Sequence, residues 1–438
     1  MAVRIKIHRG THQIGGSVTE IATAQSRILI DFGCDLNKNP DRNTDTRMMQ
    51  MIRENEYDAV LFTHYHGDHA GLMEFVPEGT VMYIGSLARK VMITIRKALR
   101  DNPKLSAEER ADHKRVLDTI LKNDDRLINY FDGQSFVVGR GKDITVTPIL
   151  ADHSACDAYM FLIEAEEKRI LHSGDFRIHG RLGAHLFPDL GKCLQGRKID
   201  ALIVEGTMMS RESESVMTEK ELQAEAEKIL RKHPYAFLLC SSTNLESLAS
   251  FSLAALNCRL PMYVSRYVDQ QIALYRKHFQ GRERQKDFGF RKVYPMEPAG
   301  YFNEKLGMTQ REYMRKNGFL ILVNKYEYSR ELMQSFSDCK PKPVVIYSLW
   351  EGYIDNPDSE TYDPELARTA YMFGEPLRRH TSGHAVPEDL AKLIQLTEPG
   401  QAVIPIHTEC PEKFDTLCVG AYRERMQYLK DGESFLLQ

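Results

Sequence analysis

The chain has 438 residues, enough for two or three domains with sizeable cores. Its 58 Lys and Arg against 61 Asp and Glu give a formal net charge of −3, which excludes a globally basic protein. Any nucleic-acid contact must therefore come from a local groove. No apolar stretch approaches the length of a membrane span, and the start of the chain, 3–7, alternates like a strand rather than a signal peptide. The eight cysteines include no CxxC pair, which predicts reduced thiols in a cytoplasmic protein.

Strand patterns dominate residues 1–85. We expect two helices next, over 86–100 and 106–122, the second of which opens with a Ser-Ala-Glu-Glu capping box. Strands then return through Glu205. From about Thr207 the pattern changes to long helices alternating with strands, as in a small parallel α/β domain.

Residues of the types found in metal and catalytic sites occur again after about Leu377. This indicates that the chain returns to its first domain. We therefore predict a first domain in two parts, 1–208 and 378–438, with an inserted domain over 209–377. The active site is expected in the cleft between the two domains.

The most informative motif is His64-Tyr65-His66-Gly67-Asp68-His69, which directly follows the apolar run 59–62. In an extended turn, His64 and His66 point to one side, whereas Asp68 and His69 face a second point. That arrangement suits two adjacent metal ions. The alternative is a solvated His-rich turn, but such turns do not usually follow a buried strand.

Further ligand-type residues follow five other predicted strands. Because sites in α/β proteins assemble at the carboxyl ends of strands, this recurrence favours one shared site. The strands are 27–30, 146–150, 169–171, 201–204 and 402–406, and the residues that follow them are Asp31, His153, Asp175, Glu205 and His407.

These motifs, with the stretch Ser173 to Arg177, resemble the metallo-β-lactamase signature. Glu205, Ser382-Gly383-His384 and Pro405-Ile406-His407 are similar to three further motifs of the β-CASP nucleases, and the chain most resembles their ribonuclease J-like members. The resemblance implies an α/β fold: a metallo-β-lactamase αββα sandwich with an inserted β-CASP-like α/β domain.

The resemblance also implies two divalent metal ions, Zn²⁺ in the first place, with Mn²⁺ as the alternative. It assigns His64, His66 and His153 to one ion and Asp68, His69 and His407 to the other, with Asp175 bridging. Asp68 is also expected among the catalytic residues, together with Asp31. A carboxylate such as Asp31 can orient a ligand imidazole, although satisfying loop amides is nearly as good an interpretation.

Glu205 and His384 are expected to act as a pair in catalysis. An imidazolium held by a carboxylate can protonate a leaving oxygen, and family resemblance gives His384 that role. The alternative is a loop histidine that caps a helix. Ser382 and Gly383 precede a predicted helix over 387–396, whose amino terminus could bind phosphate.

Substrate contacts are also predicted in the inserted domain. Ser242, Thr243 and Asn244 lie between a predicted strand and a helix and resemble a stretch that contacts the nucleotide backbone, although ordinary N-capping has the same pattern. Trp350 is either a base-stacking residue or a packing residue. The segment 276–292 carries seven Lys and Arg, which line the substrate path or form a solvated face.

The resemblance implies a metal-dependent ribonuclease that hydrolyses RNA phosphodiester bonds with a metal-bridged hydroxide, in exo or endo mode. His407 favours RNA, because DNA-acting relatives typically carry valine there. The alternatives are a small-ester or lactone hydrolase of the same fold and a non-catalytic RNA-binding subunit. The sequence leaves open the biological RNA, the end preference, the metal identity and homo-oligomerisation.

Overall fold

The structure is a computed structural model that describes residues 2–36, 44–103, 105–122, 125–211, 216–359 and 361–438, the side chains of 283 and 284 excepted. The chain divides into two compact units, Met1–Ser215 with Gly383–Gln438 (unit 1) and Val216–Ser382 (unit 2). Unit 2 is thus inserted in the sequence of unit 1. The boundaries between the units lie a few residues C-terminal to the expected domain boundaries at 208/209 and 377/378. The predicted division into domains by function stays a prediction.

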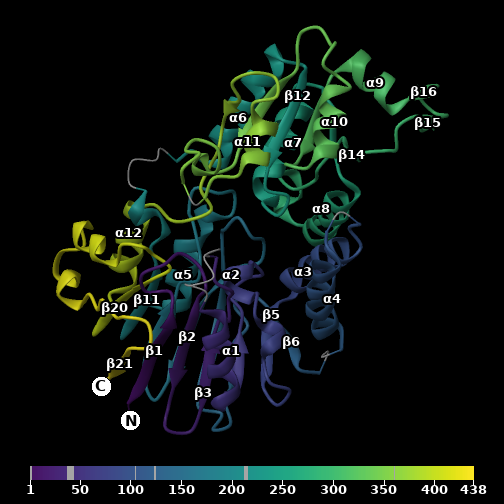
Figure 1. Cartoon of the computed structure of the whole chain (residues 1–438). Helices are drawn as coiled ribbons and strands as arrows, with labels where there is room; N and C mark the ends of the chain where they lie inside the picture. The colour runs from purple at the N-terminus through teal and green to yellow at the C-terminus, as the bar shows by residue number, and fades with distance from the viewer. Residues whose placement is uncertain (1, 37–43, 104, 123–124, 212–215, 360) are drawn as a thin grey trace. The chain divides into compact units, whose positions relative to one another are not determined.

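The first sheet of unit 1 has seven strands in the order β21-β1-β2-β3-β4-β5-β6 (Figure 1). The strands β21, β1, β2 and β3 pair antiparallel, whereas β3 to β6 pair parallel. Their bounds are β1 Val3–Arg9, β2 Val18–Ala22, β3 Arg27–Ile30, β4 Ala59–Leu61, β5 Val81–Gly85, β6 Leu127–Tyr130 and β21 Ser434–Leu437.

The second sheet has six strands in the order β20-β11-β10-β9-β8-β7, of which β10, β11 and β20 are parallel. All five residues of β11 and of β20 are buried. Burial on both faces explains why these strands read as continuous apolar runs. The bounds are β7 Phe136–Val138, β8 Ile144–Ala151, β9 Ala158–Ala165, β10 Lys168–His172, β11 Ala201–Glu205 and β20 Ala402–Ile406.

The two sheets pack face to face. One core joins inward residues of β1, such as Val3, Ile5 and Ile7, to residues of the second sheet, such as Phe161 and Ile203. A second core joins the other face of the second sheet to α5 (Leu186–Leu194) and α12 (Pro387–Thr397). The helices α1 (Asp45–Glu54) and α3 (Ser86–Arg100) follow strands of the first sheet, and α4 (Ala107–Lys122) follows α3 (Figure 1). The predicted αββα sandwich is confirmed.

Unit 2 is built on a six-stranded parallel sheet in the order β14-β13-β17-β12-β18-β19. Its core joins the sheet to α9, α10 and α11, which confirms the predicted inserted α/β domain. The elements are α6 Glu219–Lys232, β12 Tyr235–Cys240, α7 Leu245–Asn257, β13 Met262–Val264, α8 Arg266–Phe279, β14 Val293–Pro295, β15 Phe302–Asn303, β16 Met308–Thr309, α9 Gln310–Asn317, β17 Phe319–Val323, α10 Glu327–Gln334, β18 Val344–Ser348, α11 Pro364–Ala370 and β19 Leu377–Arg378. Among the described helices of both units, none combines the length and apolarity needed to cross a membrane.

The outer face of the first sheet carries a buried ion cluster next to α1. Glu20 of β2 accepts hydrogen bonds from Arg4 (2.8 Å) and Tyr57 (3.1 Å), and it also contacts His8 (2.9 Å) and Arg27 (3.7 Å). Burial alone would raise the pKa of Glu20, but His8, Arg4 and Arg27 outweigh it and lower this pKa to about 2. The ionised carboxylate therefore stabilises the fold.

Replacing Glu20 by Gln tests this contribution. Because the folded-state pKa is depressed from 4.5, the stabilisation is complete above about pH 4.5 and disappears as the pH falls to about 2. Urea unfolding at a series of pH values should show a wild-type advantage on the order of 3 kcal/mol that shrinks across this window. The exposed Glu56→Gln serves as control. Wild-type and Glu20→Gln curves that stay parallel down to pH 2 would contradict the assignment.

Candidate metal centre

The predicted site residues gather at one edge of unit 1, where strands of both sheets end. Asp31 follows β3, Asp175 lies three residues after the end of β10, and Glu205 ends β11. His64, His153 and His407 come shortly after β4, β8 and β20. The carboxyl ends of strands from two sheets thus supply side chains to one place.

From the sequence, the motif from His64 to His69 was expected to be an extended turn. The structure shows that only part of it is extended. His66 has extended backbone, but Gly67–Ala70 forms a one-turn helix, α2. The carbonyl of His66 accepts hydrogen bonds from the amides of His69 (3.1 Å) and Ala70 (2.9 Å). This turn, rather than an extended reversal, sets the positions of Asp68 and His69, and the His69 ring lies 4.1 Å from that of His64.

One oxygen of Asp175 is the point on which the site converges. Its Oδ2 lies 3.1 Å from His69 Nε2 and 3.8 Å from His407 Nε2. It also lies 3.9 Å from His153 Nε2 and 4.0 Å from His64 Nε2. Asp175 is 2% exposed, so this carboxylate is surrounded by imidazoles rather than water.

The ligand-type atoms fall into overlapping groups, each within 4.8 Å. His64, His66 and His153 form one group, and Asp68, His69, Asp175 and His407 form another. A third group combines Asp175 and His407 with Glu205 and His384. The structure therefore brings together every residue that the sequence analysis named for the centre.

In four of the histidines, an oxygen atom of another residue contacts Nδ1, the ring nitrogen that faces away from Asp175. Asp31 Oδ2 lies 2.7 Å from Nδ1 of His69, and the Gly383 carbonyl lies 2.6 Å from Nδ1 of His153. Thr207 and Thr63 place their hydroxyls 2.8 and 3.1 Å from Nδ1 of His407 and His64, respectively. These contacts turn the Nε2 atoms towards Asp175. Orientation of metal-binding histidines through the second nitrogen is the usual arrangement in metalloproteins.

Thr63, Thr207 and the Gly383 carbonyl were not found from the sequence. A threonine beside a strand end and a backbone carbonyl have no distinctive residue type or spacing. Asp31 was found, and it fulfils both expected interpretations: it contacts His69 and also accepts a hydrogen bond from the amide of Thr63 (2.7 Å).

Asp31 and His407 adopt left-handed backbone conformations, with φ of 60° and 51°. Such φ values are uncommon for residues other than glycine, and they recur at functional sites. The amide of His407 donates to the carbonyl of Gly10 (2.6 Å), which fixes the turn after β20.

The protonation states of three of the imidazoles suit a metal cation. Burial, with neighbouring imidazoles, holds the pKa of His64 well below its usual value, and burial lowers the pKa of His66 to about 4. The pKa of His153 is likewise held low by burial. Imidazoles that are neutral at neutral pH are the form that binds metal.

Two buried atoms show that these residues fit a metal. His64 Nε2 and Asp175 Oδ1 are buried and, within the described residues, have no hydrogen-bond partner. Leaving such polar atoms unpaired costs free energy, which coordination to a cation would recover. Histidine and carboxylate donors in this number are those that a divalent metal prefers.

Glu205, which is buried, and His384, which is partly buried, form a pair beside this group. His384 Nδ1 lies 3.1 and 3.2 Å from the two carboxylate oxygens of Glu205 and 3.8 Å from Asp175 Oδ2. Burial opposes protonation, but Glu205 and Asp175 outweigh it and raise the pKa of His384. His384 does not cap α12, because the N-cap is Val386 without a side-chain bond.

Gly383 packs tightly against the site. A Cβ atom there would lie 2.7 Å from Ser154 Oγ and 3.4 Å from Cε1 of His153. Glycine therefore lets the Gly383 carbonyl approach His153 closely. Ser382, the preceding residue, is buried and is the last residue of unit 2.

The other predicted substrate residues lie in unit 2. Asn244 caps α7 through the amide of Ser247 (3.1 Å), so N-capping accounts for this residue, while Ser242 and Thr243 are partly exposed before it. Trp350 is partly buried and packs edge-on against Tyr353, with ring centroids 5.3 Å apart.

The basic segment 276–292 divides into structural and exposed cations. Arg276 donates to the carbonyl of Phe290 (2.6 Å), and Arg282 contacts His278 (2.9 Å). Exposed cations are Arg282, Lys277, Lys286, Arg291 and Lys292, whereas the side chain of Arg284 lies outside the described atoms.

Comparison with known proteins indicates a family. Residues 26–235, just under half of the chain, match the beta-lactamase superfamily domain. Over this part the chain is similar to the beta-lactamase superfamily. An RNase J-like protein of Methanocaldococcus jannaschii is 28% identical over 208 residues, which cover 47% of this chain and 42% of that protein. Transcription termination factor FttA of Methanosarcina mazei is 34% identical over 71 residues, 16% of this chain and 11% of the factor.

Over just under half of its length, the chain is thus similar to an RNase J-like protein. The matches span less than half the length of either relative. A crystal structure of a protein of unknown function from Enterococcus faecalis V583 superposes over the full length of both chains, with a TM-score of 0.71 and 22% identity. That likeness shows the fold.

Asp31→Asn tests the support behind His69. Asparagine tolerates the left-handed backbone and can still accept from Thr63, but it removes the charge next to Nδ1 of His69. We expect metal affinity to fall about 10- to 100-fold, measured by competition with a chelator. Asp58→Asn, at the amino end of β4, is the matched control. Equal affinity in wild type and Asp31→Asn would show that Asp31 serves only the loop.

Proposed function

We propose that this protein is a metal-dependent ribonuclease that hydrolyses phosphodiester bonds of RNA. The observation that carries the proposal is the Glu205–His384 pair, which lies beside the His and Asp groups and contacts Asp175. Similarity to an RNase J-like protein supports RNA as the substrate class.

The centre is proposed to hold two divalent ions, Zn²⁺ or Mn²⁺. His64, His66 and His153 would bind one, Asp68, His69 and His407 the other, and Asp175 both. When bound, two such ions lower the pKa of a water molecule and neutralise charge on a phosphate group. Asp31, Thr63, Thr207 and the Gly383 carbonyl keep the ligand imidazoles oriented.

His384 is proposed to donate a proton from Nε2 to the leaving oxygen of the phosphodiester. Glu205 holds Nδ1 and, with Asp175, favours the imidazolium, which keeps the donor charged to a higher pH. A positioned acid of this kind typically contributes about 10²- to 10⁴-fold in rate. Asp68 is thus proposed to bind metal, whereas Glu205 and His384 are proposed to protonate the leaving group.

RNA contacts are proposed for Ser242, Thr243 and Asn244 of unit 2, for Ser382 and Gly383, and for the exposed cations of the segment 276–292. Hydroxyls before a helix can donate to phosphate oxygens. An active site between the two domains, and a role for Trp350 in base stacking, stay predictions.

The alternatives are less well supported. A lactone or small-ester hydrolase of this fold would use the metals but has no need of the Glu205–His384 pair. A non-catalytic RNA-binding subunit has no need of the full set of ligand residues, which the structure brings together.

The first test compares substrates on purified, metal-loaded protein: linear 5′-phosphorylated RNA, circular RNA, duplex DNA of the same sequence, and a lactone. We expect turnover of single-stranded RNA in preference to DNA. Cleavage of the circle would add an endonuclease mode. Equal turnover of DNA, or activity confined to the lactone, would overturn the proposal.

The second test is His384→Ala, with the exposed His185→Ala as control. Both metals should remain bound, and RNA should still bind. RNA turnover should fall about 10²- to 10⁴-fold, whereas a nitrophenyl phosphodiester, which has a good leaving group, should be affected much less. Adding Glu205→Gln should cost little more, because the two residues act as a unit. Loss of metal, or equal slowing of both substrates, would instead show that His384 is a ligand or a structural residue.

A further inference from the structure

The outer face of the first sheet holds a basic pocket apart from the strand ends that form the metal centre. Alternation along β1 sends Val3, Ile5 and Ile7 into the core and leaves Arg4 and Lys6 on the opposite face. These two residues, with His8, Glu20, Arg27 and Arg47, line a pocket of about 290 Å³ under α1.

The charges in this pocket do not balance. It is lined by four Lys and Arg side chains and by one carboxylate, Glu20. Both oxygens of Glu20 are already engaged: Oε1 by Arg4 (2.8 Å) and Arg27 (3.7 Å), and Oε2 by His8 (2.9 Å) and Tyr57 (3.1 Å). Glu20 therefore cannot also neutralise the other cations.

Lys6 and Arg47 carry the surplus charge. Neither makes an ion pair or side-chain hydrogen bond with any residue that the structure describes. The Nε of Arg4 is also buried without a hydrogen-bond partner. Cations lining one small pocket repel one another, and a multivalent anion would remove that repulsion and accept from these donors.

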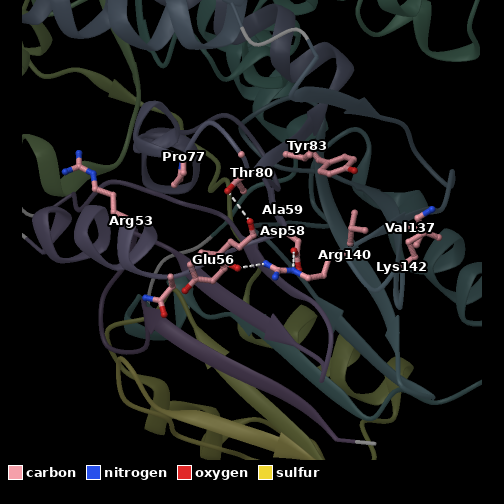
Figure 2. Close-up of a pocket in the computed structure, with 16 residues that line it drawn as sticks. Arg53, Glu56, Asp58, Ala59, Pro77, Thr80, Tyr83, Val137, Arg140 and Lys142 are labelled. Carbon is pink, nitrogen blue, oxygen red and sulfur yellow. Dashed lines mark hydrogen bonds and ion pairs between the residues drawn. The ribbon is translucent and has the colours of Figure 1, made fainter.

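A neighbouring pocket is closer to charge balance, because three Lys and Arg side chains and two carboxylates line it. It measures about 870 Å³ and lies at the amino ends of β4 and β5 (Figure 2). There Arg140 is paired with Glu56 (3.0 Å) and Asp58 (2.8 Å), as the dashed lines in Figure 2 mark. Its central cation is thus neutralised within the protein, whereas Lys6 and Arg47 are not.

We propose that the pocket formed by Arg4, Lys6, Arg27 and Arg47 binds a phosphate dianion, either inorganic phosphate or the terminal phosphate of a small phosphate monoester. The arginines suit phosphate because the guanidinium offers paired donors, and Lys6 adds a point charge. A volume of about 290 Å³ admits a phosphate group with some of its water. This site is separate from the metal centre and independent of the proposed nuclease activity.

The test is calorimetric titration of the purified, metal-loaded protein with inorganic phosphate and, separately, with 5′-AMP. The variant Lys6→Gln/Arg47→Gln removes the two cations that have no partner, so the fold should be undisturbed. Arg53→Gln/Lys142→Gln, which removes two cations from the neighbouring pocket, is the matched control. Phosphate bound at the metal centre should be unchanged in both variants.

We expect wild type and control to bind phosphate at this site with equal affinity. The affinity should fall at least tenfold in Lys6→Gln/Arg47→Gln and should be retained in Lys6→Arg. Tighter binding of 5′-AMP than of phosphate at this site would identify a monoester as the ligand, and equal or weaker binding would identify free phosphate. Isotherms of wild type and Lys6→Gln/Arg47→Gln that coincide would overturn the proposal, as would equal weakening in the control.

Discussion

Asp175 places a buried carboxylate oxygen within 4.0 Å of nitrogens from five histidines, and the rest of the site is arranged around this contact. A buried charge is tolerated only when other charges and hydrogen bonds compensate for it. Burial would raise the pKa of Asp175, but His407 and His69 outweigh it and lower this pKa well below its usual range. The carboxylate is therefore ionised, and the histidines are held within reach of it.

The sandwich serves this contact by bringing the carboxyl ends of two sheets together. His64, with Asp31 behind His69, comes from the first sheet, whereas Asp175, Glu205 and His407 come from the second. A layer of supporting groups lies outside the ligand set and fixes four of the imidazoles through Nδ1. The proposed ligands thus form an inner layer, and the groups that orient them form an outer layer. The separate basic pocket lies on the outer face of the first sheet.

Much of this could be predicted from the sequence, because ligand-type residues at strand ends are recognisable by type and position. His64, Asp175 and His407 were found in this way. The helical turn α2 was missed, because a four-residue helix leaves no periodic pattern. Thr207 was missed as well, because only the folded chain brings it next to His407. The alternation of Arg4 and Lys6 is visible in the sequence, but the helix that covers them is brought there by tertiary packing.

The central claim is that the residues around Asp175 hold two metal ions. Elemental analysis of the folded protein, purified without chelator, measures this directly. We expect two divalent ions per chain, and their loss together in Asp175→Ala, because this carboxylate is proposed to bind both ions. One ion or none in the wild-type protein, or two ions retained in Asp175→Ala, would contradict it.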